Sequence, residues 1–152
     1  MSEFRGEHTV KLDDKGRLIF PSPLKGQAAS DSDGRYIVKK HIHLNCLEIC
    51  PIEEWKIEME KIKKRLNMNI AKHALLWSEY NRNTAEITPD EKTGRISVPK
   101  QLLEMIGIEK EVVFVGLGDT INLWAKNVYE GSVMGGDDLA SLVEDILGNE
   151  AE

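Results

Sequence analysis

The sequence Gly16-Arg17-Leu18-Ile19-Phe20-Pro21 is the strongest indication of the fold, because the chain repeats its pattern as Gly94-Arg95-Ile96-Ser97-Val98-Pro99. An acidic turn that contains lysine precedes each copy, at residues 13–15 in the first and 90–93 in the second. A turn that recurs with its flanking context intact indicates that one structural unit occurs twice in the chain.

A second match extends each copy toward its C-terminal end. Residues 47–50, which lead to Trp55, resemble residues 121–124, which lead to Tyr129. We therefore divide the chain into a first repeat with a helical connector, a second repeat, and an acidic tail. The spacing of the apolar residues in the tail allows a helix. These predicted domains are residues 4–83, 84–130 and 131–152.

Each repeat is expected to contain the same short elements. A strand enters the turn, and the glycine at the end of the turn, Gly16 or Gly94, suits a positive φ angle. A second strand leaves with alternating apolar residues, and a proline then ends it and starts a short helix. Further strands are predicted at residues 9–12, 36–38, 46–49, 86–88, 112–115 and 121–124.

Apolar residues return at helical spacing in the connector and in the tail. In the connector they are Trp55, Met59, Ile62 and Leu66, followed by Ile70, Ala71, Ala74, Leu75 and Trp77. In the tail they are Leu139, Leu142, Val143 and Ile146, after a break that contains Gly131, Gly135 and Gly136. The tail helix is otherwise acidic, so we expect its apolar stripe to pack on the body or on a neighbouring subunit.

The two repeats are expected to share one core. Units of about 45–60 residues are marginal on their own, because they bury too little apolar surface. The repeats therefore pack on each other about a pseudo-twofold axis in our prediction. Strands outnumber helices in both repeats, so the predicted fold class is α+β, mainly β.

The composition is typical of a soluble globular protein, with 152 residues of which 41% are hydrophobic and 30% charged. Two cysteines cannot build a disulfide framework. The longest apolar run, residues 112–115, is far too short to span a membrane, and the first eleven residues lack the apolar core of a secretory signal. We expect a cytoplasmic protein with no membrane partner.

The net charge of −6 is a property of the tail. Residues 130–152 contain seven acidic residues and no lysine or arginine, which leaves 20 basic and 19 acidic groups in residues 1–129. The body is close to neutral, and a local group of cations on it can still bind phosphate.

The repeated turn carries residues that suit DNA. Arginine donates two parallel hydrogen bonds to guanine or clamps a phosphate, and lysine supplies a point charge to phosphate. Asp13 lies four residues before Arg17, so its carboxylate can orient that guanidinium across a tight turn. In the second copy Glu91 lies four residues before Arg95.

Two other interpretations of the turn remain open. The first is a solvated turn with a surface ion pair worth about 0–1 kcal/mol. The second is a turn that both repeats need only in order to fold. A separate alternative for the whole protein is a structural assembly module that binds other proteins and makes no direct contact with DNA.

The sequence resembles the MraZ family of bacterial transcriptional regulators over residues 4–130. The resemblance is carried by Phe4-Arg5-Gly6-Glu7-His8, by Leu12-Asp13-x-Lys15-Gly16-Arg17-Leu18-x-x-Pro21, by Cys46-Leu47 leading to Trp55, and by Gly94-Arg95-Ile96-x-x-Pro99. It implies two tandem AbrB-like swapped-hairpin units, which form a double-split β-barrel. It also implies a ring-shaped homo-oligomer that binds direct repeats upstream of the division and cell-wall gene cluster containing its own gene.

The family contacts DNA through Asp-x-x-x-Arg in each unit, which maps onto Asp13 and Arg17. In the second unit the matching position holds Glu91, while Asp90 lies five residues before Arg95. The resemblance also implies a location at the nucleoid. The predicted DNA-binding residues are Asp13, Lys15, Gly16, Arg17, Glu91, Lys92, Gly94 and Arg95, with Arg5 as a further phosphate contact.

Neither a metal site nor an active site is expected. His41, His43, Cys46 and Cys50 offer suitable zinc ligands, but on an extended chain the two cysteines lie about 13 Å apart. No nucleophile elbow, zinc-binding helix or phosphate-cradling glycine loop frames the serines and histidines. We therefore predict no enzyme activity, no metal or other cofactor and no small-molecule substrate.

Overall fold

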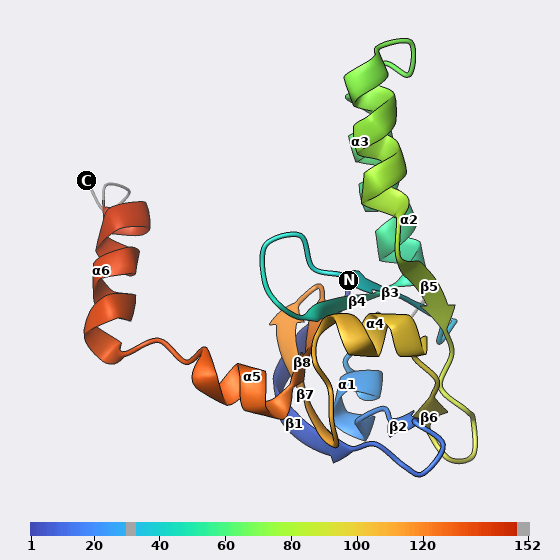
Figure 1. Ribbon diagram of the computed structural model, residues 1–152, viewed down its shortest axis with the longest axis vertical. Coiled ribbons are helices and arrows are strands. Elements are labelled where there is room, and N and C mark those ends of the chain that lie inside the picture. The colour runs from blue at the N-terminus through green and yellow to red at the C-terminus, as the bar shows by residue number, and fades with distance from the viewer. Residues whose placement is uncertain (30–32, 149–152) are drawn as a thin grey trace.

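A six-stranded sheet and a two-stranded sheet form the body of the protein in a computed structural model that describes residues 1–29 and 33–148. The fold is α+β, mainly β, as predicted (Figure 1). The strands are β1 (Phe4–Lys11), β2 (Leu18–Ile19), β3 (Tyr36–Lys40), β4 (Leu47–Pro51), β5 (Thr84–Ile87), β6 (Arg95–Ile96), β7 (Glu111–Gly118) and β8 (Ile121–Ala125). The helices are α1 (Ser22–Gly26), α2 (Ile52–Lys64), α3 (Ala71–Asn81), α4 (Lys100–Met105), α5 (Lys126–Gly131) and α6 (Gly136–Leu147).

The two repeats exchange strands in the large sheet. Its order is β1-β7-β8-β4-β3-β5, so β1 of the first repeat pairs with β7 of the second, and β5 of the second pairs with β3 of the first. When each strand is replaced by its counterpart in the other repeat, the same order is obtained, read from the opposite edge of the sheet. All neighbouring strands are antiparallel. A closed barrel and a pseudo-twofold axis stay predictions.

One hydrophobic core joins the repeats. Leu18 and Ile96, on the strands that follow the two turns, are each 1% exposed and belong to the same buried cluster. Phe20 packs edge-on against Phe114 of the second repeat, with ring centroids 5.7 Å apart. The alternation of apolar residues after each turn places these side chains inward and leaves Ile19 exposed.

The first strand is longer than the sequence pattern indicated. It begins at Phe4 rather than at residue 9, and it pairs with β7 from Phe4↔Gly118 to Lys11↔Glu111. β1 is an edge strand whose outer residues include Arg5 and Glu7, so its first half lacks the apolar alternation of a buried strand. Hydrophobic periodicity therefore missed it.

Two helical arms extend from the body (Figure 1). α2 and α3 form a hairpin in which α2 buries only Ile52 and Met59 and α3 buries no residue. On the other side α5 leads through residues 132–135 to α6, where no residue is buried. α6 lies within the predicted acidic tail, whose residues 149–152, including Glu150 and Glu152, lie outside the described residues.

None of the helices formed by residues 1–29 and 33–148 combines the length and the apolar character that crossing a bilayer requires.

Candidate nucleic-acid interface

The two repeated turns lie side by side because the strands that follow them pair with each other. β2 and β6 are antiparallel, with Leu18 opposite Ile96 and Ile19 opposite Arg95. The Phe20 N–H donates to the carbonyl of Gly94 at 2.8 Å. Both turns thus emerge at one end of the body, beyond β2 and β6 (Figure 1). Residues far apart in the chain meet there, as the DNA-binding prediction requires.

The first turn is closed by its own aspartate. The Asp13 N–H donates to the Arg17 carbonyl at 2.9 Å, and the Gly16 N–H donates to the Asp13 carbonyl at 3.0 Å. The side-chain Oδ1 of Asp13 accepts from the backbone N–H groups of Lys15 at 2.9 Å and Arg17 at 2.8 Å. Gly16 has a φ of +75°, which L side chains rarely adopt.

Asp13 also holds the first arginine. Its Oδ2 accepts from the Arg17 Nε at 2.9 Å. The backbone N–H of Arg17 lowers the pKa of Asp13 most, against a smaller rise from desolvation, and the Arg17 side chain lowers it further. The carboxylate therefore stays ionised and fixes the direction of the guanidinium.

The second turn uses Asp90 where the sequence spacing pointed to Glu91. The Asp90 N–H donates to the Arg95 carbonyl at 2.9 Å, and the Gly94 N–H donates to the Asp90 carbonyl at 2.8 Å. Asp90 Oδ1 accepts from the backbone N–H groups of Lys92 and Thr93, each at 2.9 Å. The matching of Glu91 with Asp13 was therefore wrong, because this turn is one residue longer between its aspartate and its arginine.

Arg95 makes its ion pair across the repeat boundary. Its Nε lies 3.5 Å from Oδ2 of Asp13, the oxygen that Arg17 also contacts. Within the described residues Arg95 has no ion pair with Asp90 or Glu91. One carboxylate thus draws the two arginines of different repeats together.

Both guanidinium groups remain accessible. The side chains of Arg17 and Arg95 are 37% and 36% exposed, and each turns its Nε toward Asp13. Within the described residues the terminal nitrogens of neither group donate a hydrogen bond. These nitrogens are therefore free to donate to a ligand in front of the turns.

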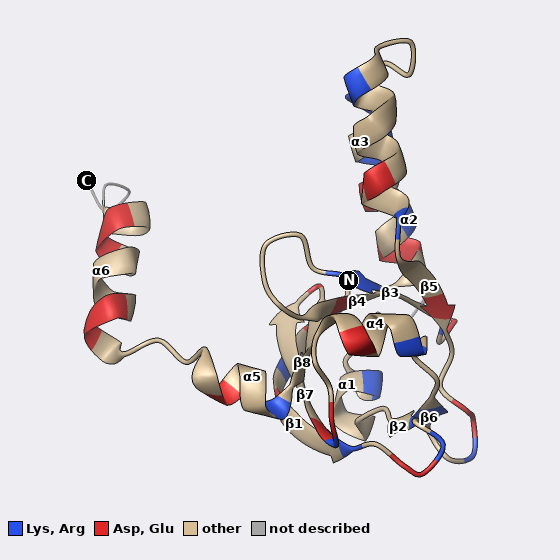
Figure 2. Cartoon of the chain, in the orientation of Figure 1, with Lys and Arg blue, Asp and Glu red and all other residues tan. Residues whose placement is uncertain are grey.

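The charge at the turns is balanced (Figure 2). Residues 13–17 and 90–95 together contain four lysines and arginines and four aspartates and glutamates. Asp13 and Asp90 hold the backbone of the turns, whereas Lys15 and Lys92 are exposed. A ligand in front of the turns would therefore meet positioned donors rather than a strong net positive field.

Arg5 is not brought to the turns. It lies on β1 opposite Leu117, and its backbone N–H donates to Gln27 Oε1 at 3.0 Å. At the rise of an extended strand it is about 20 Å from Lys11, where β1 ends and the first turn begins. A phosphate contact at Arg5 stays a prediction that requires DNA to extend well past the turns.

A groove beside the first turn adds residues that the sequence analysis missed. It has a volume of about 680 Å³ and lies between Lys15, Gly16 and the residues around α4, which include Val98, Lys100 and Leu103. The Lys100 side chain is 89% exposed and lies 3.9 Å from Glu104. Lys100 could have been found by inspection of the repeat, because this cation directly follows the proline of the repeated motif.

The candidate zinc ligands are used in other ways. Cys46 and Cys50 are buried free thiols, and burial raises the pKa of each to about 12. His41 Nδ1 accepts from the backbone N–H groups of His43 and Leu44 at 3.0 Å. Across residues 1–29 and 33–148, no three His, Cys, Asp or Glu side chains are grouped to hold a metal ion.

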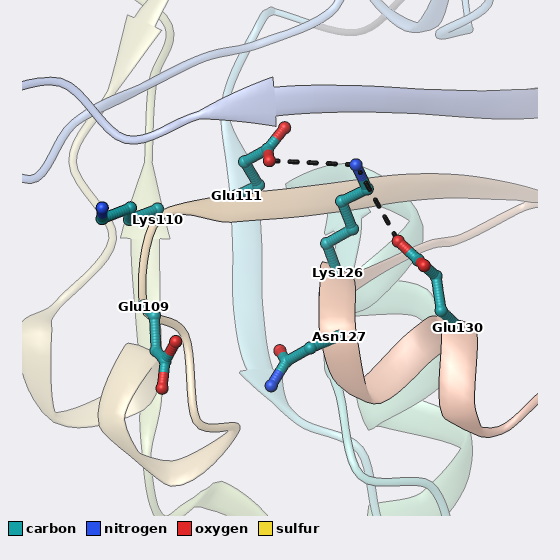
Figure 3. A pocket seen from close by; sticks show the side chains of 6 residues that line it. All are labelled: Glu109, Lys110, Glu111, Lys126, Asn127 and Glu130. Atoms are coloured by element: carbon teal, nitrogen blue, oxygen red, sulfur yellow. Dashed lines mark ion pairs between the residues drawn. The ribbon is translucent and has the colours of Figure 1, made fainter.

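A second hollow lies between β7 and α5 (Figure 3). Lys126 Nζ is 3.8 Å from Glu111 Oε1 and 3.8 Å from Glu130 Oε1. The lysine therefore links the start of β7 to the end of α5. The charge of Lys126 is matched by these two carboxylates, so this lysine holds α5 against β7.

Comparison with known proteins gives the family. The sequence model of the family described as "MraZ protein, putative antitoxin-like" matches residues 4–77 and 81–133. The chain belongs to the MraZ family. The two MraZ matches correspond to the two repeats, and each includes one of the turns described above.

Curated MraZ relatives match almost the whole chain. One from Bacteroides thetaiotaomicron is 31% identical over 99% of this chain and 96% of the relative. One from Bacteroides fragilis is 33% identical over 99% and 94%, and one from Christiangramia forsetii is 34% identical over 95% and 93%. Each of these relatives bears the name "Transcriptional regulator MraZ".

Proposed function

We propose that this chain is a transcription regulator that binds specific double-stranded DNA through its two turns. The observation that carries the proposal is the convergence of Arg17 and Arg95 on the Asp13 carboxylate, while their terminal nitrogens donate no hydrogen bond within the described residues. The names of the relatives support the same class of function. An enzyme activity or a small-molecule substrate has no part in this proposal.

The paired arginines supply base recognition and the lysines supply phosphate contacts. A guanidinium held by a carboxylate through Nε can present its remaining N–H groups to O6 and N7 of guanine in the major groove. Lys15 and Lys92 extend from the same turns and can reach the flanking phosphates. Gly16 and Gly94 bring the backbone close to the DNA without a side chain between them.

The operator is a set of direct repeats, and the active form is a ring of identical chains. Head-to-tail subunits present the same turns in the same orientation, so they match direct repeats rather than palindromes. Following the family resemblance, the repeats lie upstream of the division and cell-wall gene cluster that contains this protein's own gene. The protein is then cytoplasmic and associated with the nucleoid.

The strand exchange fits the tandem-domain part of the proposal. Residues 4–83 and 84–130 form two swapped-hairpin units of a double-split β-barrel, related by a pseudo-twofold axis, and residues 131–152 form the tail. Such an axis through the β2–β6 pair relates Arg17 to Arg95. The two contacts on DNA then have a fixed separation, which adds to specificity.

A gel-shift experiment on the DNA preceding the protein's own gene tests the function. Arg17→Ala and Arg95→Ala should each abolish the specific shift while leaving the thermal unfolding temperature unchanged, because both side chains are more than a third exposed. Lys25→Ala, an exposed cation on α1, serves as the matched control. Unchanged affinity of the arginine variants at equal oligomer size would favour the assembly-module interpretation instead.

A salt titration gives an independent test. Each phosphate contact contributes about −0.9 to the slope of log affinity against log salt concentration. Replacing Lys15 or Lys92 by alanine should therefore reduce the magnitude of this slope by about 1 for each subunit that contacts the DNA. A flat titration of the wild type contradicts the proposed phosphate contacts.

A further inference from the structure

α6 is an exposed amphipathic helix without a partner in the described chain. Its apolar residues Leu139, Leu142, Val143 and Ile146 recur at positions i, i+3, i+4 and i+7, and they are between 42% and 61% exposed. Such a stripe of large apolar side chains on one helix face is typical of an interaction surface.

The charge on α6 restricts what can cover this stripe. Asp137, Asp138, Glu144 and Asp145 flank the apolar residues, and α6 contains no lysine or arginine. Pairing of two such helices would bring like charges together, which is destabilising. DNA is excluded as an occupant for the same reason. The partner surface must be apolar with basic edges.

The outer part of the α2–α3 hairpin has these properties. Residues 61–78 contain no acidic residue and carry the five cations Lys61, Lys63, Lys64, Arg65 and Lys72. Exposed apolar side chains lie among them, namely Met68, Ile70, Leu75 and Leu76, which are 40% to 62% exposed. Figure 2 shows the contrast between the acidic α6 and the basic end of this hairpin.

Part of the hairpin charge is not used within the chain. Lys64 pairs with Glu60 at 3.5 Å, and Lys63 lies over the Trp77 ring at 5.8 Å. Among the described residues Lys61, Arg65 and Lys72 form no ion pair. These three cations are available to the carboxylates of a partner.

We propose that α6 of one subunit docks on the α2–α3 hairpin of a neighbouring copy of this chain. The two arms extend from different sides of their own body and stand apart (Figure 1). Residues 132–135 span at most about 14 Å when extended, which ties α6 to its own α5. Docking between copies covers both apolar surfaces and places four carboxylates among five cations. The inference rests on the self-association in the proposed function and is independent of DNA binding.

The test uses full-length chains grown in ¹⁴N and ¹⁵N media, mixed under conditions that exchange subunits, and treated with a carbodiimide. This reagent joins carboxylates to lysines that are in direct contact. Mass spectrometry should find cross-links between α6 carboxylates and Lys61 or Lys72 that combine both isotopes. Cross-links confined to one isotope, cross-links from α6 to Lys15 or Lys92, or the absence of any α6 cross-link would each overturn the proposal.

Charge reversal provides a second test of the docking. The triple variant Lys61→Glu, Arg65→Glu, Lys72→Glu should lose the mixed cross-links, and Lys25→Glu on α1 should keep them. Adding Asp138→Lys, Glu144→Lys and Asp145→Lys to the triple variant should restore them with the chemistry reversed. Neither set alters the core, because none of these side chains is buried. Failure of the restoration counts against the proposal.

DNA binding measured on the same samples separates the two proposals. If mixed cross-links form but no operator is bound, the regulator function fails and the docking stands. If the operator is bound but no mixed cross-links form, the docking fails and the function stands. A wild type that light scattering finds to be monomeric overturns the docking whatever the DNA result.

Discussion

Arg95 of the second repeat lies 3.5 Å from the Asp13 carboxylate of the first repeat, the same group that binds Arg17 at 2.9 Å. The two turns are therefore linked through a side chain as well as through the β2–β6 pair. Asp13 is a positioning residue for both arginines, and its loss should affect both at once.

Asp13→Asn should weaken specific DNA binding although it removes a negative charge near DNA. The amide cannot hold two guanidinium groups as the carboxylate does, so both arginines lose their direction. Asp14→Asn removes an equal charge from an exposed neighbour and is the matched control. In a gel shift we expect about tenfold lower affinity for Asp13→Asn than for Asp14→Asn. Equal affinities would contradict the positioning role.

The turn aspartates should titrate below the usual range of about 3.9. The backbone N–H of Arg17 lowers the pKa of Asp13, and the backbone N–H groups of Thr93 and Lys92 lower that of Asp90. Their contribution to folding stability is therefore present above the unfolded-state pKa and is lost as the pH falls through the lowered folded-state pKa. Carboxyl-carbon NMR titration measures both values; a midpoint at or above 3.9 for either would be incompatible with the turn geometry.

Gly116→Ala should disrupt the pairing of β1 with β7. A Cβ at this position would lie 2.3 Å from the backbone nitrogen of Arg5, which neither strand can avoid without moving. We expect a loss of roughly 1–3 kcal/mol or more in the free energy of unfolding, measured with urea. Gly26→Ala is the control, because its Cβ meets nothing within 4 Å and it sits in α1. Equal free energies of unfolding for the two variants would contradict the close approach of Gly116 to the backbone of Arg5.

Cys46 and Cys50 should resist alkylation in the folded protein. Burial raises the pKa of each thiol to about 12, so almost none of the reactive thiolate exists at pH 8. Mass spectrometry after iodoacetamide treatment should find both thiols unmodified in the native state and modified in urea. Rapid labelling of the native protein at pH 8 would mean that β4 opens readily.

Much of the fold followed from the repeat. The pattern that begins at Gly16 and returns at Gly94 predicted the turns, the strands after them and a core common to both repeats. It could not predict that β1 pairs with β7, because apolar alternation shows which face of a strand is buried and carries no information on its neighbour. The polar first half of β1 gave no alternation at all.

The sequence located both turns of the candidate site, but the expected geometry of the second turn was wrong in one detail. Counting four residues back from Arg95 gives Glu91, but turn length is set by backbone hydrogen bonds, and the aspartate that closes the longer second turn is Asp90. The contact between Arg95 and Asp13 needs the spatial pairing of β2 with β6. No count along the chain reveals it.

The exchange of strands also constrains how the protein is made. β1 leaves the ribosome well before its partner β7, which ends at Gly118. During synthesis β1 therefore stays unpaired until β7 has emerged, and the six-stranded sheet is complete only after β8, which ends at Ala125. Contacts between such distant segments slow folding. A nascent chain halted before β7 would expose β1 to chaperones and to other unfinished copies of itself.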